Sequence, residues 1–195
     1  MREGRSARPL GRGHYFELGL DLLAEGGAKA VTIDALCGRL QVTKGSFYHH
    51  FKSGRDFLWQ LLVYWEDRYG QRLAREAMAA RGAAELIPLM KQRAAYDVRH
   101  EAESAIRALA QSDPFAAEVQ QRVDQGREDL LVDTFLQAGI PLDTARTLAR
   151  IGVAILIGVQ QRERPVDRDR LRTLFDEYQR WIQASIVLEQ GEAVR

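Results

Sequence analysis

Apolar residues recur at helical spacing along almost the whole chain, and no segment alternates apolar and polar residues as a strand does. The first helical pattern runs from about Gly13 to Glu25 and ends at a glycine pair, and a long pattern begins at Ser53 and continues toward Ala79. Later helical patterns cover residues 85–100, 115–138, 143–161 and 167–189. The sequence therefore predicts an all-α fold.

Two short helical patterns lie between the first helix and the long one. The first opens at Thr32, a typical N-cap residue, and its apolar face consists of Ile33, Leu36, Cys37 and Leu40. A three-residue break follows, and the second short helix opens at Thr43 with Phe47 and Phe51 four residues apart on its buried side. This arrangement predicts a helix-turn-helix.

The second short helix would expose Lys44, Gly45, Ser46, Tyr48 and His49. Such side chains suit a helix that enters a major groove, where they bond base edges, and a glycine there lets the backbone approach the duplex closely. Lys52 precedes the next helix, which Ser53 and Asp56 are expected to open as a capping box, so Lys52 is placed as a phosphate anchor. The segment predicts a DNA-binding protein.

Two exposed-looking residues have a second interpretation. Tyr48 could be a half-buried packing aromatic, although its neighbours His49 and Lys52 favour phosphate contact. His50 lies beside Phe47 and Phe51 in the sequence, and we expect it to pack against the core rather than contact DNA.

The last two helical patterns look like an association surface. The stretch IGVAILIGV at residues 151–159 is apolar around the whole helix, so we expect one side to face its own core and the other a partner, with Gly152 and Gly158 allowing close approach. The terminal helix adds an apolar stripe: Leu171, Leu174, Phe175, Tyr178, Trp181, Ile182 and Ile186. A two-fold four-helix bundle would bury both helices, with Gly152, Ile155, Val159, Phe175, Tyr178 and Ile182 at the homodimer interface.

Composition narrows the class of protein. A chain of 195 residues with 46% hydrophobic content can bury a core of one or two domains. Cys37 is the single cysteine, which excludes a disulfide framework and a cysteine-based zinc site and predicts a buried, inert thiol. The four histidines, His14, His49, His50 and His100, show no metal-ligand grouping, so we expect no metal and no cofactor. The longest apolar run, residues 151–159, is too short to span a bilayer, and we expect a cytoplasmic protein.

The net charge of +1 conceals an asymmetry. Residues 1–60 hold nine Lys and Arg against six Asp and Glu, whereas residues 61–195 hold 19 against 21. The basic part coincides with the helix-turn-helix pattern, as expected for a segment that meets a polyanion. The arginine-rich start (Arg2, Arg5, Arg8 and Arg12) is either an arm that enters a minor groove or a solvated tail, and Arg12 is the better contact candidate.

The motif VTIDAL…L-x-V-TKGSFYHHFKS, with its upstream glycine pair and downstream long helix, resembles the TetR family of transcriptional regulators over residues 10–60. The resemblance implies a homodimer on a palindromic operator, a DNA-binding domain at 1–58, and a helical domain at 59–195 that dimerises and binds a small molecule. It implies DNA contacts for Thr32, Thr43, Lys44, Gly45, Ser46, Tyr48, His49 and Lys52.

This chain departs from the family pattern at two positions. Gln41 stands where the turn usually holds a glycine, so it is expected to adopt a left-handed conformation at some cost. Gly54 stands where the family favours a phosphate-binding lysine. Arg55 is the nearest substitute, turned about 100° around the helix.

The resemblance also implies a ligand cavity between the helices of residues 64–138. Its expected lining is Trp65, Met90, Tyr96, Arg107 and Phe135, the irregular or polar members of those helix faces. Trp65 and Tyr96 favour an aromatic or apolar compound, and Arg107, if buried, would indicate an anionic group on it.

Three hypotheses from different classes follow. The first is a sequence-specific homodimeric repressor that a small molecule releases from its operator. The second is a helical binding module whose helix-turn-helix is structural and reads no specific sequence. The third is an all-α enzyme built on Ser46 with His49 or His50, but no orienting acid or oxyanion hole has a sequence signature, so we expect no enzyme.

Overall fold

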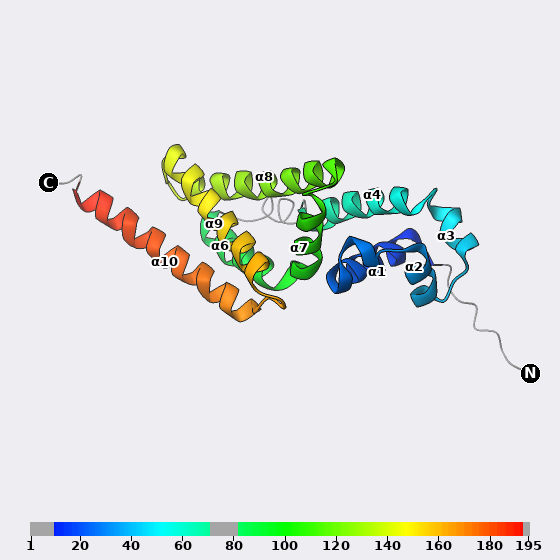
Figure 1. Ribbon diagram of the computed structural model, residues 1–195. Coiled ribbons are helices and arrows are strands. Elements are labelled where there is room, and N and C mark those ends of the chain that lie inside the picture. Colours follow the sequence, from blue (N-terminus) through cyan, green and yellow to red (C-terminus); the bar gives the residue numbers. More distant parts are fainter. Residues whose placement is uncertain (1–9, 71–81, 193–195) are drawn as a thin grey trace, which may run out of the picture.

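The computed structural model describes residues 10–70 and 82–192, and within these ranges it contains helices and no strand (Figure 1). Four helices form one end of the molecule: α1 (Arg12–Gly26), α2 (Ile33–Leu40), α3 (Lys44–His50) and α4 (Gly54–Trp65). The remainder consists of α6 (Ala83–Gln92), α7 (His100–Leu109), α8 (Pro114–Gln137), α9 (Leu142–Arg162) and α10 (Arg168–Glu192). A 3-10 turn, η1 (Ala28–Ala30), and two π-helical turns, η2 (Glu66–Gly70) and η3 (Arg93–Asp97), join some of them. The all-α prediction is confirmed.

Side-chain caps open several helices where the sequence predicts them. The side chains of Thr32, Thr43 and Ser53 each accept a hydrogen bond from the backbone N–H three residues on, at 3.1, 3.3 and 3.1 Å. Asp113 and Asp167 do the same for α8 and α10, at 2.9 and 3.0 Å. These contacts satisfy N–H groups that a helix start otherwise leaves without a partner.

An aromatic core holds the N-terminal helices together. Tyr15, Phe47, Phe51 and Phe57 are at most 2% exposed, and their rings pack edge to face or tilted at 4.9–6.1 Å between centroids. The same core continues past residue 58 into the second half of α4 and onto α7, which packs along α1. The N-terminal helices therefore rest on α7 through α1.

The predicted helix over residues 85–100 is wrong in its length. The chain forms α6 up to Gln92, passes through η3, and becomes extended at Val98 before α7 begins at His100. The His100 ring turns back over this break and its Nε2 lies 3.0 Å from the Ala95 carbonyl oxygen. Periodicity alone missed the break because apolar positions keep helical spacing across it.

The far end of the molecule is built from α8, α9 and α10. Helices α8 and α9 pack against each other across a turn that contains Gly139, whose φ of +82° suits a glycine. Helix α10 crosses α9 and also contacts α6 and η3 (Figure 1). Within residues 10–70 and 82–192, no helix combines the length and the apolar character needed to cross a bilayer.

Candidate nucleic-acid interface and ligand cavity

The turn between α2 and α3 is shaped by Gln41. Its φ of 55° and ψ of 43° lie in the left-handed region, as the sequence predicts, and its backbone N–H donates to carbonyl oxygens at the end of α2. The chain then reaches Thr43, which caps α3. This turn sets the direction in which α3 leaves α2.

Helix α3 has one buried face and one open face. Phe47 is fully buried against Tyr15 and Phe57, which leaves Lys44, Gly45, Tyr48 and His49 exposed. Tyr48 is 55% exposed even though its ring packs edge-on against Phe47. The open face thus carries four of the residues that the sequence predicts at DNA.

Ser46 lies between the two faces of α3. It is half-buried, and its hydroxyl shares a hydrogen bond of 3.1 Å with the hydroxyl of fully buried Tyr15 on α1. The same Ser46 contributes its backbone N–H to the Thr43 cap. Ser46 therefore ties α3 to α1, a role that sequence reasoning missed because Tyr15 is 31 residues away.

Lys44 is held by a neighbour on α2. Its Nζ lies 2.6 Å from Asp34 Oδ1, and both side chains are well exposed. The hydrogen bond and the negative charge of Asp34 raise the pKa of Lys44 above its usual value. Nearby, burial raises the pKa of the Cys37 thiol, whose Sγ lies 3.7 Å from the Thr43 carbonyl oxygen, so this thiol is buried as predicted.

The start of α4 fixes the backbone at Lys52. The Asp56 carboxylate accepts a hydrogen bond of 2.8 Å from the Lys52 N–H, while Ser53 caps the Asp56 N–H. Only half of the predicted capping box forms, because Asp56 accepts from the Lys52 N–H rather than from the N–H of Ser53 itself. The Lys52 N–H lowers the pKa of the Asp56 carboxyl, and the Lys52 side chain remains exposed.

Arginine side chains near this face stack on aromatic rings. The Arg55 guanidinium lies 4.8 Å from the centroid of Trp59, and Arg12 lies 5.3 Å from that of Phe51. His50 is half-buried with its ring 5.6 Å from that of Tyr15, which agrees with the predicted packing role. Arg2, Arg5 and Arg8 lie outside the described residues.

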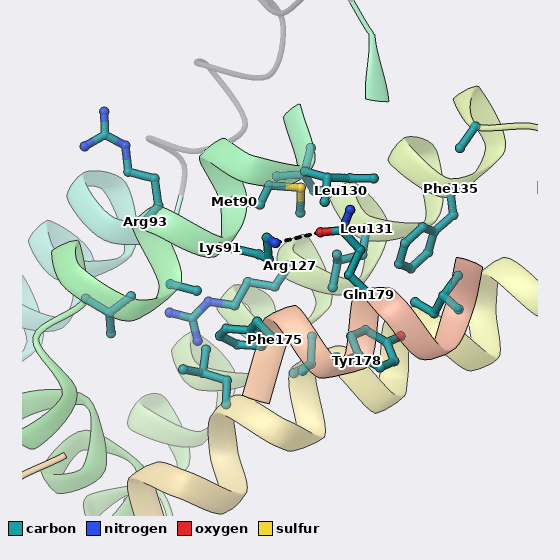
Figure 2. A pocket seen from close by; sticks show the side chains of 18 of the residues that line it. Met90, Lys91, Arg93, Arg127, Leu130, Leu131, Phe135, Phe175, Tyr178 and Gln179 are labelled. Atoms are coloured by element: carbon teal, nitrogen blue, oxygen red, sulfur yellow. Dashed lines mark hydrogen bonds between the residues drawn. The ribbon is translucent and has the colours of Figure 1, made fainter. Parts of the chain in front are cut away.

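A largely apolar cavity of about 260 Å³ opens between α6, α8, α9 and α10 (Figure 2). Its apolar lining includes Met90, Leu130, Leu131, Phe135, Leu156 and Phe175. Met90 and Phe135 were expected at the cavity from the sequence, and both line it. The volume lies near the lower end of ordinary ligand sites.

The other three residues expected at the cavity are elsewhere. Trp65 is 1% exposed in the aromatic core of the N-terminal helices, because α4 packs on α8 at that level. Tyr96 donates a 2.5 Å hydrogen bond to Asp169, and Arg107 donates two to Asp124 at 2.7 and 3.0 Å. These positions are corrections to the sequence prediction, since helix rotation, which periodicity leaves undefined, turns them away.

Arg127 on α8 is a cavity residue that sequence reasoning missed. Its guanidinium donates two hydrogen bonds, at 2.6 and 2.8 Å, to the carboxylate of Glu103 on α7. Burial by itself raises the pKa of the fully buried Glu103 carboxyl, but Arg127 and Arg107 more than offset this and hold that pKa below its usual value. Oppositely charged residues repeat at helical spacing on α7 and α8, Glu103 with Arg107 and Asp124 with Arg127, and this signal could have found the cluster.

The predicted dimer residues mostly face inward. Gly152, Val159, Phe175 and Ile182 are buried within the single chain, and Gly152 lies under Leu131 and Tyr178. Tyr178 is half-buried, donates to the Leu148 carbonyl oxygen and lines the cavity; Ile155 is partly buried. Among the described side chains of α9 and α10, the large apolar ones that are exposed are instead Leu142, Ile151, Leu174 and Trp181, at 43%, 37%, 38% and 57%. A helix that is apolar all round does not show which side packs on its own core, and here the single chain itself buries most of the residues predicted at the interface.

Comparison with known proteins places the helix-turn-helix in a family. Residues 16–58 match the model described as "Bacterial regulatory proteins, tetR family". A 37-residue stretch is 51% identical to the transposon Tn10 TetC protein of Escherichia coli, and this alignment spans 19% of each chain, so it covers about a fifth of that relative. No group of three His, Cys, Asp or Glu side chains in the described part of the chain is placed to hold a metal ion.

Solved structures share the whole fold at low sequence identity. A transcriptional regulator from Rhodococcus sp. Rha1 gives a TM-score of 0.69 at 19% identity, with 87% of this chain and 94% of that chain covered. A TetR transcriptional regulator from Legionella pneumophila gives 0.69 at 13% identity, over 91% and 98% of the two chains. The helix-turn-helix segment therefore matches the tetR family of bacterial regulatory proteins, and the fold of the chain is that of the solved regulators.

Proposed function

We propose that this protein is a sequence-specific, homodimeric repressor that a small molecule releases from a palindromic operator. The observation that carries the proposal is the open face of α3, where Lys44, Gly45, Tyr48 and His49 stand exposed while Phe47 anchors the helix in the core. Residues 1–58 would be the DNA-binding domain and residues 59–195 the domain that binds ligand and dimerises, in the cytoplasm where the DNA lies.

The DNA contacts we propose divide into two kinds. Lys44 and His49 would read base edges in the major groove, and Gly45 would let the helix backbone approach the duplex closely. Thr32, Thr43, Tyr48 and Lys52 would contact phosphates and set the register. Ser46 would act mainly through its hydrogen bond to Tyr15, which orients α3.

The dimer we propose pairs α9 and α10 with their copies around a two-fold axis. Exposed Ile151, Leu174 and Trp181 supply the apolar contact, and such side chains on adjacent helices are costly to leave in water. Partly buried Ile155 lies along the same side of α9 as Ile151, one turn on. Two heads held by this bundle would meet successive major grooves, so a ligand that favours another head spacing would lower DNA affinity.

The test is fluorescence anisotropy of the full chain on the duplex upstream of its own coding sequence and on a scrambled duplex, across a salt series. We expect tighter binding to the native duplex. We also expect the affinity to fall as salt rises, with a slope that corresponds to the release of several counterions. Lys52→Ala should weaken binding to both duplexes and reduce the salt slope, whereas Arg146→Ala, an exposed change on α9, should not.

The alternative is a binding module whose helix-turn-helix serves packing alone. It predicts equal, weak and salt-erased binding to every duplex, including those from a random-sequence selection. An enzyme would instead show turnover that depends on Ser46, His49 or His50. Selection of one preferred duplex sequence would exclude the module.

A further inference from the structure

The charged side chains that line the cavity are mainly cations. Arg68, Lys91, Arg93 and Arg127 line it, together with one carboxylate, Asp97, which is paired with Arg93. The carboxylates that pair with Lys91 and Arg127 are Asp176, Glu103 and Asp124, and none of these is a lining residue. Each of these pairs therefore turns its positive member toward the cavity.

Arg127 brings its charge into an apolar setting. Its side chain is 13% exposed and lies among the apolar side chains of the pocket in the view of Figure 2. A guanidinium has five N–H donors, and its hydrogen bonds to Glu103 use one on each terminal nitrogen. Its planar fork matches a carboxylate in a bidentate way, and a low-dielectric wall strengthens that attraction.

We propose that the cavity binds a medium-chain amphipathic carboxylate, whose apolar chain fills the pocket and whose carboxylate takes the place of Glu103 on Arg127. The proposal rests on the ligand-responsive function given above. A cavity of about 260 Å³, near the lower end of ordinary ligand sites, suits a ligand with a short or medium apolar chain better than a long-chain lipid. Octanoate has this size and charge.

Replacement of Glu103 connects the cavity to the DNA-binding helices. Glu103 on α7 is fully buried. If the ligand takes Arg127, the cation that still faces the Glu103 carboxylate is Arg107, at 3.6 Å. Two carboxylates cannot share one guanidinium edge without like-charge repulsion, so an occupied site pushes α7 away from α8. Helix α7 packs along α1, and Arg99, just before α7, donates to Asp21 and to the Glu17 carbonyl oxygen at 2.5 and 3.2 Å. Movement of α7 is therefore passed to α1 and the helix-turn-helix.

The cationic side chains that line the cavity favour a negatively charged ligand. A quaternary ammonium group would face cations of like sign, and the Asp97 carboxylate already pairs with Arg93. An uncharged alcohol can fill the apolar volume, but it has no charge with which to displace Glu103. Of these three head groups, only the carboxylate can both fill the cavity and take a position on Arg127.

The experiment is isothermal titration calorimetry of the full chain with octanoate, 1-octanol and octyltrimethylammonium. We expect octanoate to bind at least tenfold more tightly than either analogue. Glu103→Gln should tighten octanoate at least tenfold because the competing charge is gone, and Arg127→Gln should weaken it at least tenfold while 1-octanol changes less than twofold. Arg122→Gln is the matched control, since Arg122 lies on the same helix, pairs bidentately with Glu66 and does not line the cavity.

Two further readouts keep the test decisive. If circular dichroism shows that Arg127→Gln does not fold, two other variants test the proposal. These are Glu103→Gln and Arg127→Lys, and the latter keeps the positive charge but loses the planar fork. Equal affinity for octanoate and 1-octanol, or an octanoate affinity that Glu103→Gln leaves unchanged, would overturn the proposal. In that case sequence-specific duplex binding would show that the regulatory function stands and that only the ligand class is wrong. Loss of duplex preference would count against the function itself.

Discussion

The hydroxyl of Tyr15 on α1 lies 3.1 Å from the hydroxyl of Ser46 on α3, so the helix proposed to enter the major groove is tied to the first helix of the chain. Tyr15 is fully buried and its ring touches those of Phe47 and Phe51. The orientation of α3 thus depends on both apolar packing and one polar contact.

Tyr15→Phe should lower the free energy of unfolding by about 1 kcal/mol, since it removes this hydrogen bond and keeps the ring. Urea denaturation followed by circular dichroism measures the change. Tyr48→Phe is the matched control, because it removes a hydroxyl from an exposed ring. It should change the free energy of unfolding by less than about 0.5 kcal/mol, and it should weaken DNA binding. An unchanged unfolding midpoint for Tyr15→Phe would mean that ring packing alone orients α3.

Asp34→Asn should tighten DNA binding about two- to tenfold at low salt. The substitution frees Lys44 from its 2.6 Å ion pair and removes a negative charge close to the proposed DNA face, and an exposed pair costs little to break. Anisotropy titrations on the same duplex measure the gain, which should shrink as salt rises. Asp143→Asn, an equal charge change on a fully exposed side chain of α9, should have no such effect. A weaker complex for Asp34→Asn would show that the pair positions Lys44 instead of restraining it.

Gln41→Gly should stabilise the protein by about 0.5–1 kcal/mol. A side chain in the left-handed region costs about 1–2 kcal/mol, and the extra freedom of glycine in the unfolded chain offsets part of the gain. Urea denaturation measures it, and Gln41→Val should be destabilising because branched side chains tolerate this conformation least. A loss of stability in Gln41→Gly would point to a contact of the Gln41 side chain that holds the turn.

Stability should fall as pH falls below about 6.5, in part through His100. Burial lowers the pKa of this ring in the folded protein from 6.5, although its hydrogen bond to Ala95 partly offsets the shift. Below pH 6.5 the unfolded state therefore binds a proton that the folded state does not, and the loss approaches at most about 1.4 kcal/mol per pH unit until the folded pKa is reached.

Urea unfolding at pH 7.5, 6.5 and 5.5 measures this slope, and His100→Asn should flatten it. His14 is exposed, so His14→Asn is the control that should leave the slope as it is. A slope equal in His100→Asn and the parent protein would assign the pH dependence to other groups.

Trp181→Glu should convert the proposed dimer into monomers, because it places a charge in the contact between α10 and its copy. The single chain should tolerate the change, since Trp181 is 57% exposed. Light scattering coupled to size exclusion measures the mass, and Val63→Glu is the control, because Val63 is an apolar residue on α4 that is 49% exposed. A dimer that survives Trp181→Glu would place the interface on another surface.

Local features of this fold were predictable from the sequence. The caps at Thr32, Thr43 and Ser53 and the buried pair Phe47 and Phe51 all depend on residues within a few positions of each other, whereas the left-handed Gln41 was expected from the glycine that the family pattern has there. The exposed face of α3 followed from the same spacing. These features are local because a helix start, a turn and a helix face are set by steric and hydrogen-bonding preferences over one or two turns.

The relations between distant segments were decided by the tertiary structure. Periodicity shows that a helix has an apolar side but not how it is rotated against its neighbours, so Trp65 and Arg107 were expected at the cavity although the fold turns them elsewhere. The same freedom left open which side of α9 and α10 packs on the chain's own core, and it concealed the contacts of Tyr15 with Ser46 and of Glu103 with Arg127. Hydrophobic burial has no preferred direction, and it joins residues that are far apart in the sequence. The rotation of each helix against its neighbours is therefore determined only when all the helices pack together.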